Sequence, residues 1–102
     1  MRITTTARHC EISEELRERA RALLERLSRV APRSQDASAL FGKDHGAPTV
    51  EVRLRTARGG VHVGSASGAD HHSALDAAVA KVRRQLDKAG VRRGRPSVRE
   101  PR

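Results

Sequence analysis

The chain has 102 residues, with 21 Lys and Arg against 12 Asp and Glu, and a formal net charge of +9. This length supports one domain with a single core, which argues against a separate catalytic domain. We expect no membrane-spanning helix, because the chain has no run of 18 apolar residues. We also expect no secretory signal, because the N-terminus lacks an apolar segment.

The positive charge is spread along the chain. Residues 91–102 have a net charge of +4, and residues 1–90 have +5. A basic surface attracts polyanions, of which phosphate backbones are abundant. The alternative is a soluble, arginine-rich protein from an organism of biased composition. Because Phe41 is the only aromatic residue, the chain lacks the stacking platform of single-strand readers, and any RNA binding is expected to use phosphates and shape.

Cys10 is the only cysteine. An intramolecular disulfide and a four-cysteine metal site are therefore excluded, and a cytoplasmic location is expected. We interpret Cys10 as a small, half-buried core residue rather than a nucleophile.

The first third of the chain predicts a strand followed by a helix. Residues 2–9 are rich in β-branched residues, and Ile3, Thr5 and Ala7 would share one face of a strand. Ser13 precedes two glutamates, as in the N-cap and acidic first turn of a helix. An apolar stripe at helical spacing follows: Leu16, Ala20, Leu23, Leu24 and Leu27. The helix should end by Ala31, because Pro32 disfavours a helical residue before it.

The middle of the chain predicts three further strands. Residues 35–42 form the first, with Ala37, Ala39 and Phe41 facing inward, and residues 43–48 form a turn. Residues 49–57 alternate between apolar and charged side chains, which is the pattern of a half-buried strand. The glycine-containing segment 58–60 predicts a tight hairpin turn, and the returning strand runs from Val61 to about Ser67.

A second helix is expected to begin at Asp70 or Ser73 and to end near Gly90. Its apolar stripe consists of Leu75, Ala78, Val79, Val82 and Leu86. Residues 91–102 lack periodicity and predict a disordered basic tail. The predicted fold is α+β with the order β-α-β-β-β-α, in which two helices pack on one face of a mainly antiparallel four-stranded sheet. We expect one domain over residues 1–90.

Cations on the second helix form a ridge of one sign. At 100° per residue, Lys81, Arg84 and Lys88 fall within roughly 60° of one another and are expected opposite the apolar stripe. No acid lies among them, which favours an anionic partner.

The first helix mixes the signs of its charges. Arg17 and Arg21 flank its stripe on one side, and Arg19 and Arg26 on the other. The glutamates of this helix stand at spacings that allow pairing with most of these arginines. Only arginines close to the other helix are strong candidates for phosphate contact.

Catalytic and metal motifs are not apparent. The five histidines show no metal-binding spacing such as His-x3-His on a helix, and the adjacent His71 and His72 would diverge by about 100° on a helix. Gly59-Gly60 lacks the Gly-Lys-Ser/Thr that completes a phosphate loop. No nucleophile–base set or carboxylate pair stands out. We expect no metal, no cofactor, no small-molecule substrate and no enzymatic activity.

Four short segments match motifs of one known family in the same order. They are ARHCEISEELR (residues 7–17), VEV with RGGVHV (50–52 and 58–63), DHHSALD (70–76), and KVRRQL with Lys88 (81–88). The chain resembles the hibernation-promoting factor and ribosome-associated inhibitor family, also called the sigma-54 modulation protein / S30EA family. The resemblance covers residues 2–89, and the chain is similar to short members, which lack the C-terminal dimerisation domain.

The resemblance implies a ribosome-binding inhibitor of translation. Members bind the small (30S) subunit, and hence the 70S ribosome, where mRNA and tRNA normally sit, and they silence ribosomes in stationary phase and stress. It implies contacts to 16S rRNA phosphates from Arg17, Arg26, Lys81, Arg84 and Lys88. The charge pattern selects the last three independently. A cytoplasmic protein without a membrane partner, monomeric when free, is expected. Short members either promote ribosome pairing or block single ribosomes, and both outcomes stay open.

Two features depart from the family pattern. His71-His72 replaces a pair made of methionine and tyrosine, and Gly46-Ala47-Pro48 next to an alanine-rich strand predicts a distorted sheet edge. Two other functions are compatible with the same residues. One is a general double-stranded RNA-binding module, and the other is a protein-interaction regulator of transcription.

Overall fold

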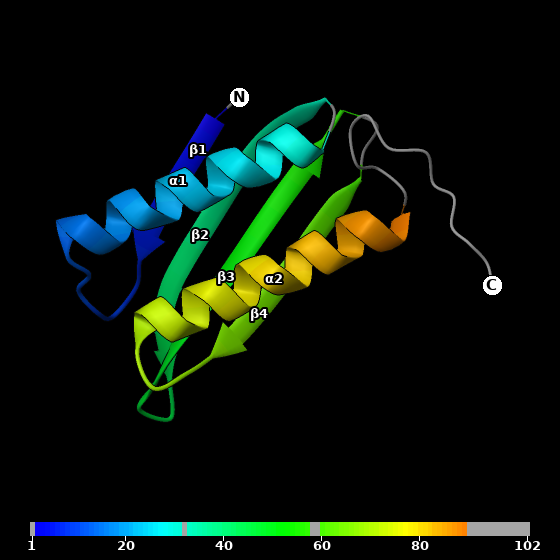
Figure 1. The fold of residues 1–102 in the computed structure, drawn as a ribbon. Coiled ribbons are helices and arrows are strands. Elements are labelled where there is room, and N and C mark those ends of the chain that lie inside the picture. Colours follow the sequence, from blue (N-terminus) through cyan, green and yellow to red (C-terminus); the bar gives the residue numbers. More distant parts are fainter. Residues whose placement is uncertain (1, 32, 58–59, 90–102) are drawn as a thin grey trace.

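The computed structural model describes residues 2–31, 33–57 and 60–89. The elements are β1 (Arg2–Ala7), α1 (Glu14–Val30), β2 (Ser34–Asp44), β3 (Ala47–Thr56), β4 (Val61–Ser67) and α2 (His71–Ala89). The strands form one sheet in the order β1-β2-β3-β4, in which β1 is parallel to β2 and the other neighbours are antiparallel. Both helices lie side by side on one face (Figure 1). The predicted β-α-β-β-β-α fold is confirmed.

The core lies between the sheet and the two helices. The inward positions expected in β2 and β3 are buried, Phe41 and Val52 among them, and so is most of each helical stripe. Leu23 and Val79 are half-buried and pack against this core. Cys10 also packs there in a half-buried position, as predicted. Among the described residues no polar or charged side chain is buried.

The β2–β3 connection is tighter than the sequence suggested. The turn lies inside the expected residues 43–48, but it takes up only His45 and Gly46. The two strands pair without a break from Asp36↔Arg55 to Asp44↔Ala47, so the expected distortion near Pro48 was wrong. The chain reverses direction at His45 (φ 54°) and Gly46 (φ 82°). Two consecutive residues with positive φ match the right-handed twist of the flanking strands, which lets both strands continue to the turn. The irregularity lies instead at the other end of β2, between Ser34 and Asp36.

The expected start of α1 after Ser13 is confirmed, and of the two starts expected for α2, Asp70 is correct and Ser73 is wrong. The Leu16 amide donates to Ser13 Oγ at 3.0 Å, and α1 ends at Val30 with Ala31 as its C-cap. The Ser73 amide donates to Asp70 Oδ1 at 2.8 Å ahead of α2. This amide hydrogen bond, with a further contribution from the Ser73 side chain, lowers the pKa of Asp70 below its ordinary value of 3.8.

Helix α1 packs over β1 and β2, whereas α2 packs over β3 and β4. Gly64 in β4 is buried under α2. A Cβ atom at Gly64 would lie 2.7 Å from the Ala78 carbonyl oxygen and 2.9 Å from Lys81 Cβ. The absence of a side chain therefore permits the close approach of helix to strand, and this approach fixes where the cations of α2 lie.

Three sequence predictions lie outside the described residues. They are the hairpin turn at Arg58 and Gly59, the helix stop at Gly90 and the basic tail over residues 91–102. In the part of the chain that is described, no helix is both long and apolar enough to cross a membrane.

Replacing Gly64 with alanine should destabilise the fold. The added methyl group collides with the backbone of α2, which would have to shift, and overpacking of this kind costs about 1–3 kcal/mol. Urea denaturation followed by circular dichroism measures the change. Ser67→Ala, on the exposed face of the same strand, serves as the control and should be near neutral. A Gly64→Ala variant as stable as the parent would show that α2 lies farther from β4.

Asp70 should make stability depend on pH at the acidic end. Because its folded-state pKa is lowered, its contribution is complete above pH 3.8 and is lost as the pH falls through the folded-state value. Asp70→Asn keeps a capping side chain but cannot titrate. Thermal melts between pH 2 and pH 6 should therefore show a steeper acidic decline for the parent than for Asp70→Asn. Parallel declines would contradict this assignment.

Candidate nucleic-acid interface

Arg17 lies on the outer flank of α1, over the edge strand β1. Its Nη1 donates to Thr5 Oγ1 at 2.9 Å and to the Thr5 carbonyl oxygen at 3.4 Å. The side chain is half-buried. Arg17 therefore covers a backbone group at the edge of the sheet, on the side of α1 away from α2.

Lys81 makes the equivalent contact at the other edge of the sheet, over β4. Its Nζ donates to the Ser65 carbonyl oxygen at 2.7 Å, and Gln85 Nε2 donates to the Val63 carbonyl oxygen at 2.6 Å. Both carbonyls belong to β4, the second edge strand. The expectation that Lys81 lies opposite the apolar stripe was therefore wrong. Helical spacing places Arg84 and Lys88 on this same flank, and both are exposed.

The side of α1 that faces α2 carries Arg19 and Arg26. Arg19 Nη2 contacts Asp76 Oδ1 of α2 at 2.8 Å, with both side chains about half exposed. The expected pairs between the arginines and glutamates of α1 were wrong. In the described part of the chain, Arg19 is the α1 arginine that forms an ion pair, and its partner lies on the other helix.

The five residues predicted from the sequence thus fall into three places. Arg17 lies over β1, Arg26 faces α2, and the ridge of Lys81, Arg84 and Lys88 runs along the β4 flank of α2. Sequence reasoning missed Arg83. It lies seven residues after Asp76, so it points toward α1 as Asp76 does. The seven-residue spacing of Asp76 and Arg83 can be read from the sequence. That this side of α2 faces α1 follows only from the Arg19–Asp76 contact, which joins residues 57 positions apart.

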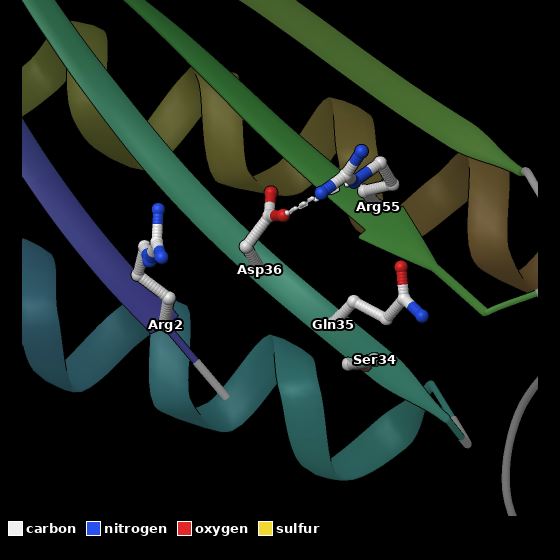
Figure 2. Close-up of a pocket in the computed structure, with 5 residues that line it drawn as sticks. All are labelled: Arg2, Ser34, Gln35, Asp36 and Arg55. Atoms are coloured by element: carbon white, nitrogen blue, oxygen red, sulfur yellow. Dashed lines mark hydrogen bonds and ion pairs between the residues drawn. The ribbon is translucent and has the colours of Figure 1, made fainter.

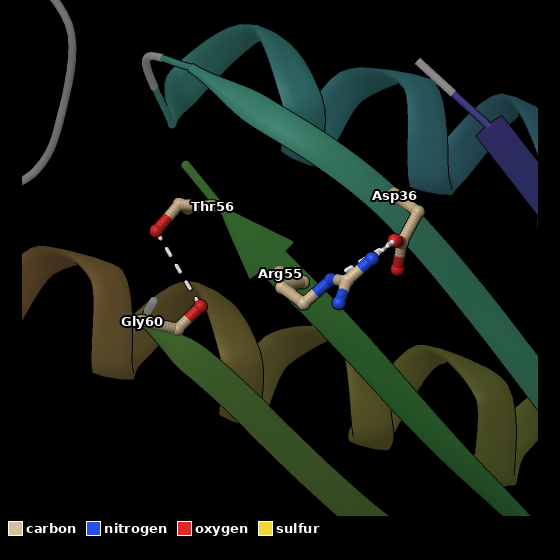
Figure 3. A network of polar contacts seen from close by, with 4 residues as sticks. All are labelled: Asp36, Arg55, Thr56 and Gly60. Carbon is tan, nitrogen blue, oxygen red and sulfur yellow. Dashed lines mark hydrogen bonds and ion pairs between the residues drawn. The ribbon is translucent and has the colours of Figure 1, made fainter. Parts of the chain in front are cut away.

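The helix-free face of the sheet also carries arginines, but two of them are paired. Arg53 contacts Glu51 at 2.9 Å, and Arg55 contacts Asp36 at 2.6 Å. Figure 3 shows the Asp36–Arg55 pair between neighbouring strands, near the Thr56 and Gly60 contact that closes the β3–β4 hairpin. Paired charges attract phosphates less than free ones, so this face is the weaker candidate.

A hollow of about 490 Å³ lies on this helix-free face (Figure 2). It is lined by Arg2, Ser34, Gln35, Asp36 and Arg55. Asp36 contributes a carboxylate to the hollow and already pairs with the Arg55 guanidinium. Among the described residues, no cluster of His, Cys, Asp and Glu has the arrangement needed to bind a metal ion.

His71 takes a structural role at the start of α2. Its Nε2 lies 2.8 Å from the Gly42 carbonyl oxygen, to which it donates, and its ring meets Phe41 edge to face with centroids 5.7 Å apart. The neighbouring His72 is exposed. His71, the first residue of the departing pair, therefore packs against the core through Phe41.

Comparison with known proteins decides the family. The model of the family described as "Sigma 54 modulation protein / S30EA ribosomal protein" matches residues 3–93. The chain belongs to this family. The S30EA match spans every element of the sheet and both helices. No curated protein sequence matches the chain significantly.

Two solved structures share the S30EA fold of this chain. One is a ribosomal subunit interface protein from Coxiella burnetii, with a TM-score of 0.75 and 23% identity over 87% of this chain and 97% of that one. The other is the N-terminal domain of Thermus thermophilus Protein Y, with a TM-score of 0.73 and 23% identity over 87% of this chain and 99% of that one. At this identity the likeness establishes the fold.

The contact of Lys81 with β4 predicts a small contribution to stability. Lys81→Met keeps the apolar stem but removes the donor to the Ser65 carbonyl, so the free energy of unfolding should fall by about 0.5–1 kcal/mol. Arg84→Met, without such a contact among the described residues, should change it by less than about 0.5 kcal/mol. Urea denaturation of both variants tests this, and equal stabilities would show that Lys81 does not cap the strand edge.

Proposed function

We propose that the protein binds the small ribosomal subunit through its helical layer and inhibits translation by occupying the channel for mRNA and tRNA. The helices would contact 16S rRNA phosphates, and the mechanism is exclusion, without a chemical step. Membership of the S30EA ribosomal protein family supports the ribosome as the partner. The name of the Coxiella burnetii protein, a ribosomal subunit interface protein, supports the same partner for a protein of this fold.

The observation that carries the proposal is the contrast between the two faces. Within the described residues, Lys81, Arg84 and Lys88 form no ion pair with a carboxylate, whereas Arg53 and Arg55 on the helix-free face each form one. Cations without a carboxylate partner on a rigid helix can replace the counterions of an RNA backbone without first breaking an ion pair. The helical layer is therefore the face that we propose for RNA contact.

In the free protein, the side chains of Arg17 and Lys81 already form hydrogen bonds within the fold. Both side chains donate to edge-strand carbonyls, and a long, exposed side chain such as Lys81 can exchange that acceptor for a phosphate. Arg17 is half-buried and doubly bound to Thr5, so its movement costs more. Among the five proposed contacts we therefore expect Arg17 to contribute least to affinity.

Neutralising three cations on each face in turn tests this proposal. Lys81→Gln/Arg84→Gln/Lys88→Gln should weaken binding to small subunits by about tenfold or more and lower the salt slope of log K by about 2 to 3. The matched control, Arg2→Gln/Arg53→Gln/Arg55→Gln, removes the same charge from the helix-free face and should retain most of the affinity. Sedimentation with 30S and 70S particles measures both.

Equal losses from the two triple variants would contradict the proposed face. Equal competition by generic duplex RNA would favour a general double-stranded RNA-binding module instead. Unchanged ribosome binding by the helix variant would favour a protein-interaction role. The parent should lose roughly 10³–10⁵ in affinity between 50 and 200 mM salt if six to ten phosphates are contacted. A salt-independent affinity would contradict phosphate recognition altogether.

A further inference from the structure

The line along which α1 and α2 face each other is here called the interhelical seam. It consists of Arg19, Leu23 and Arg26 from α1 and of Asp76, Val79 and Arg83 from α2. The helices run side by side in the same direction (Figure 1). Arg19 Nη2 and Asp76 Oδ1 lie 2.8 Å apart, which fixes one level of the seam.

The next level of the seam follows from helix geometry. Arg26 and Arg83 each lie seven residues beyond this pair, which is two turns and about 10.5 Å along each axis. Seven residues return a side chain to nearly the same face, so both arginines are directed toward the seam. Leu23 and Val79 lie between the two levels and are half-buried against the core, so the floor of the seam is apolar.

The two levels differ in charge. At the first level, Asp76 neutralises Arg19. At the second, Arg26 and Arg83 are both exposed, and neither forms an ion pair with a carboxylate in residues 2–31, 33–57 and 60–89. Asp87, one turn beyond Arg83, lies on the same side of α2 and has an interaction of its own. Two guanidinium groups of like sign on facing helices favour an anion between them. The planar donor forks of arginine match the oxygens of a phosphate better than a lysine ammonium does.

We propose that Arg26 and Arg83 together hold one backbone phosphate of the bound RNA between the helices, and that Asp76 prevents Arg19 from taking a second. This assignment rests on the proposed function, which it deepens by adding Arg83 to the contacts. It places the RNA strand across the C-terminal halves of the helices. The residues of the ridge, Lys81, Arg84 and Lys88, lie in that same half of α2.

Single and double neutralisation of the two arginines tests the shared phosphate. Arg26→Gln and Arg83→Gln should each weaken binding to small subunits by about fivefold to tenfold and lower the salt slope by about 1. The double variant should lose little more affinity than the single variant with the larger loss, because both side chains bind the same phosphate. Arg21→Gln, which removes one charge from the β1 flank of α1, is the control and should stay within about twofold of the parent.

Asp76→Asn provides a test in the opposite direction. Removing the carboxylate frees Arg19 for a phosphate at the first level, so affinity should rise by about twofold to fivefold. Thermal melts of every variant verify the fold, since all the altered side chains are exposed. An Arg83→Gln variant that binds like the parent overturns the assignment. Full additivity of the two arginine changes overturns the shared phosphate, and unchanged or weaker binding by Asp76→Asn overturns the role of Asp76.

The outcomes separate this assignment from the proposed function. If the parent does not bind small subunits, both fall together. If the parent binds and Lys81→Gln/Arg84→Gln/Lys88→Gln weakens it, while Arg26→Gln and Arg83→Gln do not, the proposed function stands and the shared phosphate site is wrong.

Discussion

The sheet has one apolar face, and the placement of both helices depends on this constraint. Buried side chains of β2 and β3 such as Phe41, Val52 and Leu54 point to the same side, so an apolar stripe on either helix can be buried only there. Two helices on one face of a four-stranded sheet must lie side by side. The sides of the helices that face solvent and the sides that face each other then form a single layer of charged residues. The opposite face of the sheet stays open to solvent.

The cations on the two faces of the molecule differ in whether they form ion pairs, because their neighbours differ. On the helix-free face, cross-strand neighbours bring Arg55 to Asp36, and alternation along β3 brings Arg53 to Glu51. On the helical layer, Asp76 is occupied by Arg19, and the ridge of Lys81, Arg84 and Lys88 has no acid among its members. Arg17 and Lys81 additionally cover carbonyls of the two edge strands. Covering exposed strand edges hinders edge-to-edge association, so these two cations have a structural use in the free protein.

Local rules predicted most of the fold. Alternation identified β3, capping residues at Ser13 and Asp70 set the helix starts, and helical spacing identified both apolar stripes. The length of the β2–β3 turn was misjudged, because a run of loop-forming residues over 43–48 did not reveal that His45 and Gly46 alone could reverse the chain. The surface was predicted less well. A helical wheel shows the direction of a side chain but not its partner, so Lys81 bonding to β4 and Arg19 bonding to α2 required the tertiary structure.

Site-directed cleavage of 16S rRNA tests the central claim most directly, namely that the helical layer and not the helix-free face meets the RNA. In a Cys10→Ser background, an iron chelate that generates hydroxyl radicals would be tethered to Ala80→Cys on α2 or to Thr4→Cys on the opposite face of the sheet, both at exposed positions. We expect strong, localised cleavage in bound small subunits from position 80 and weak cleavage from position 4. Stronger cleavage from position 4 would contradict the account.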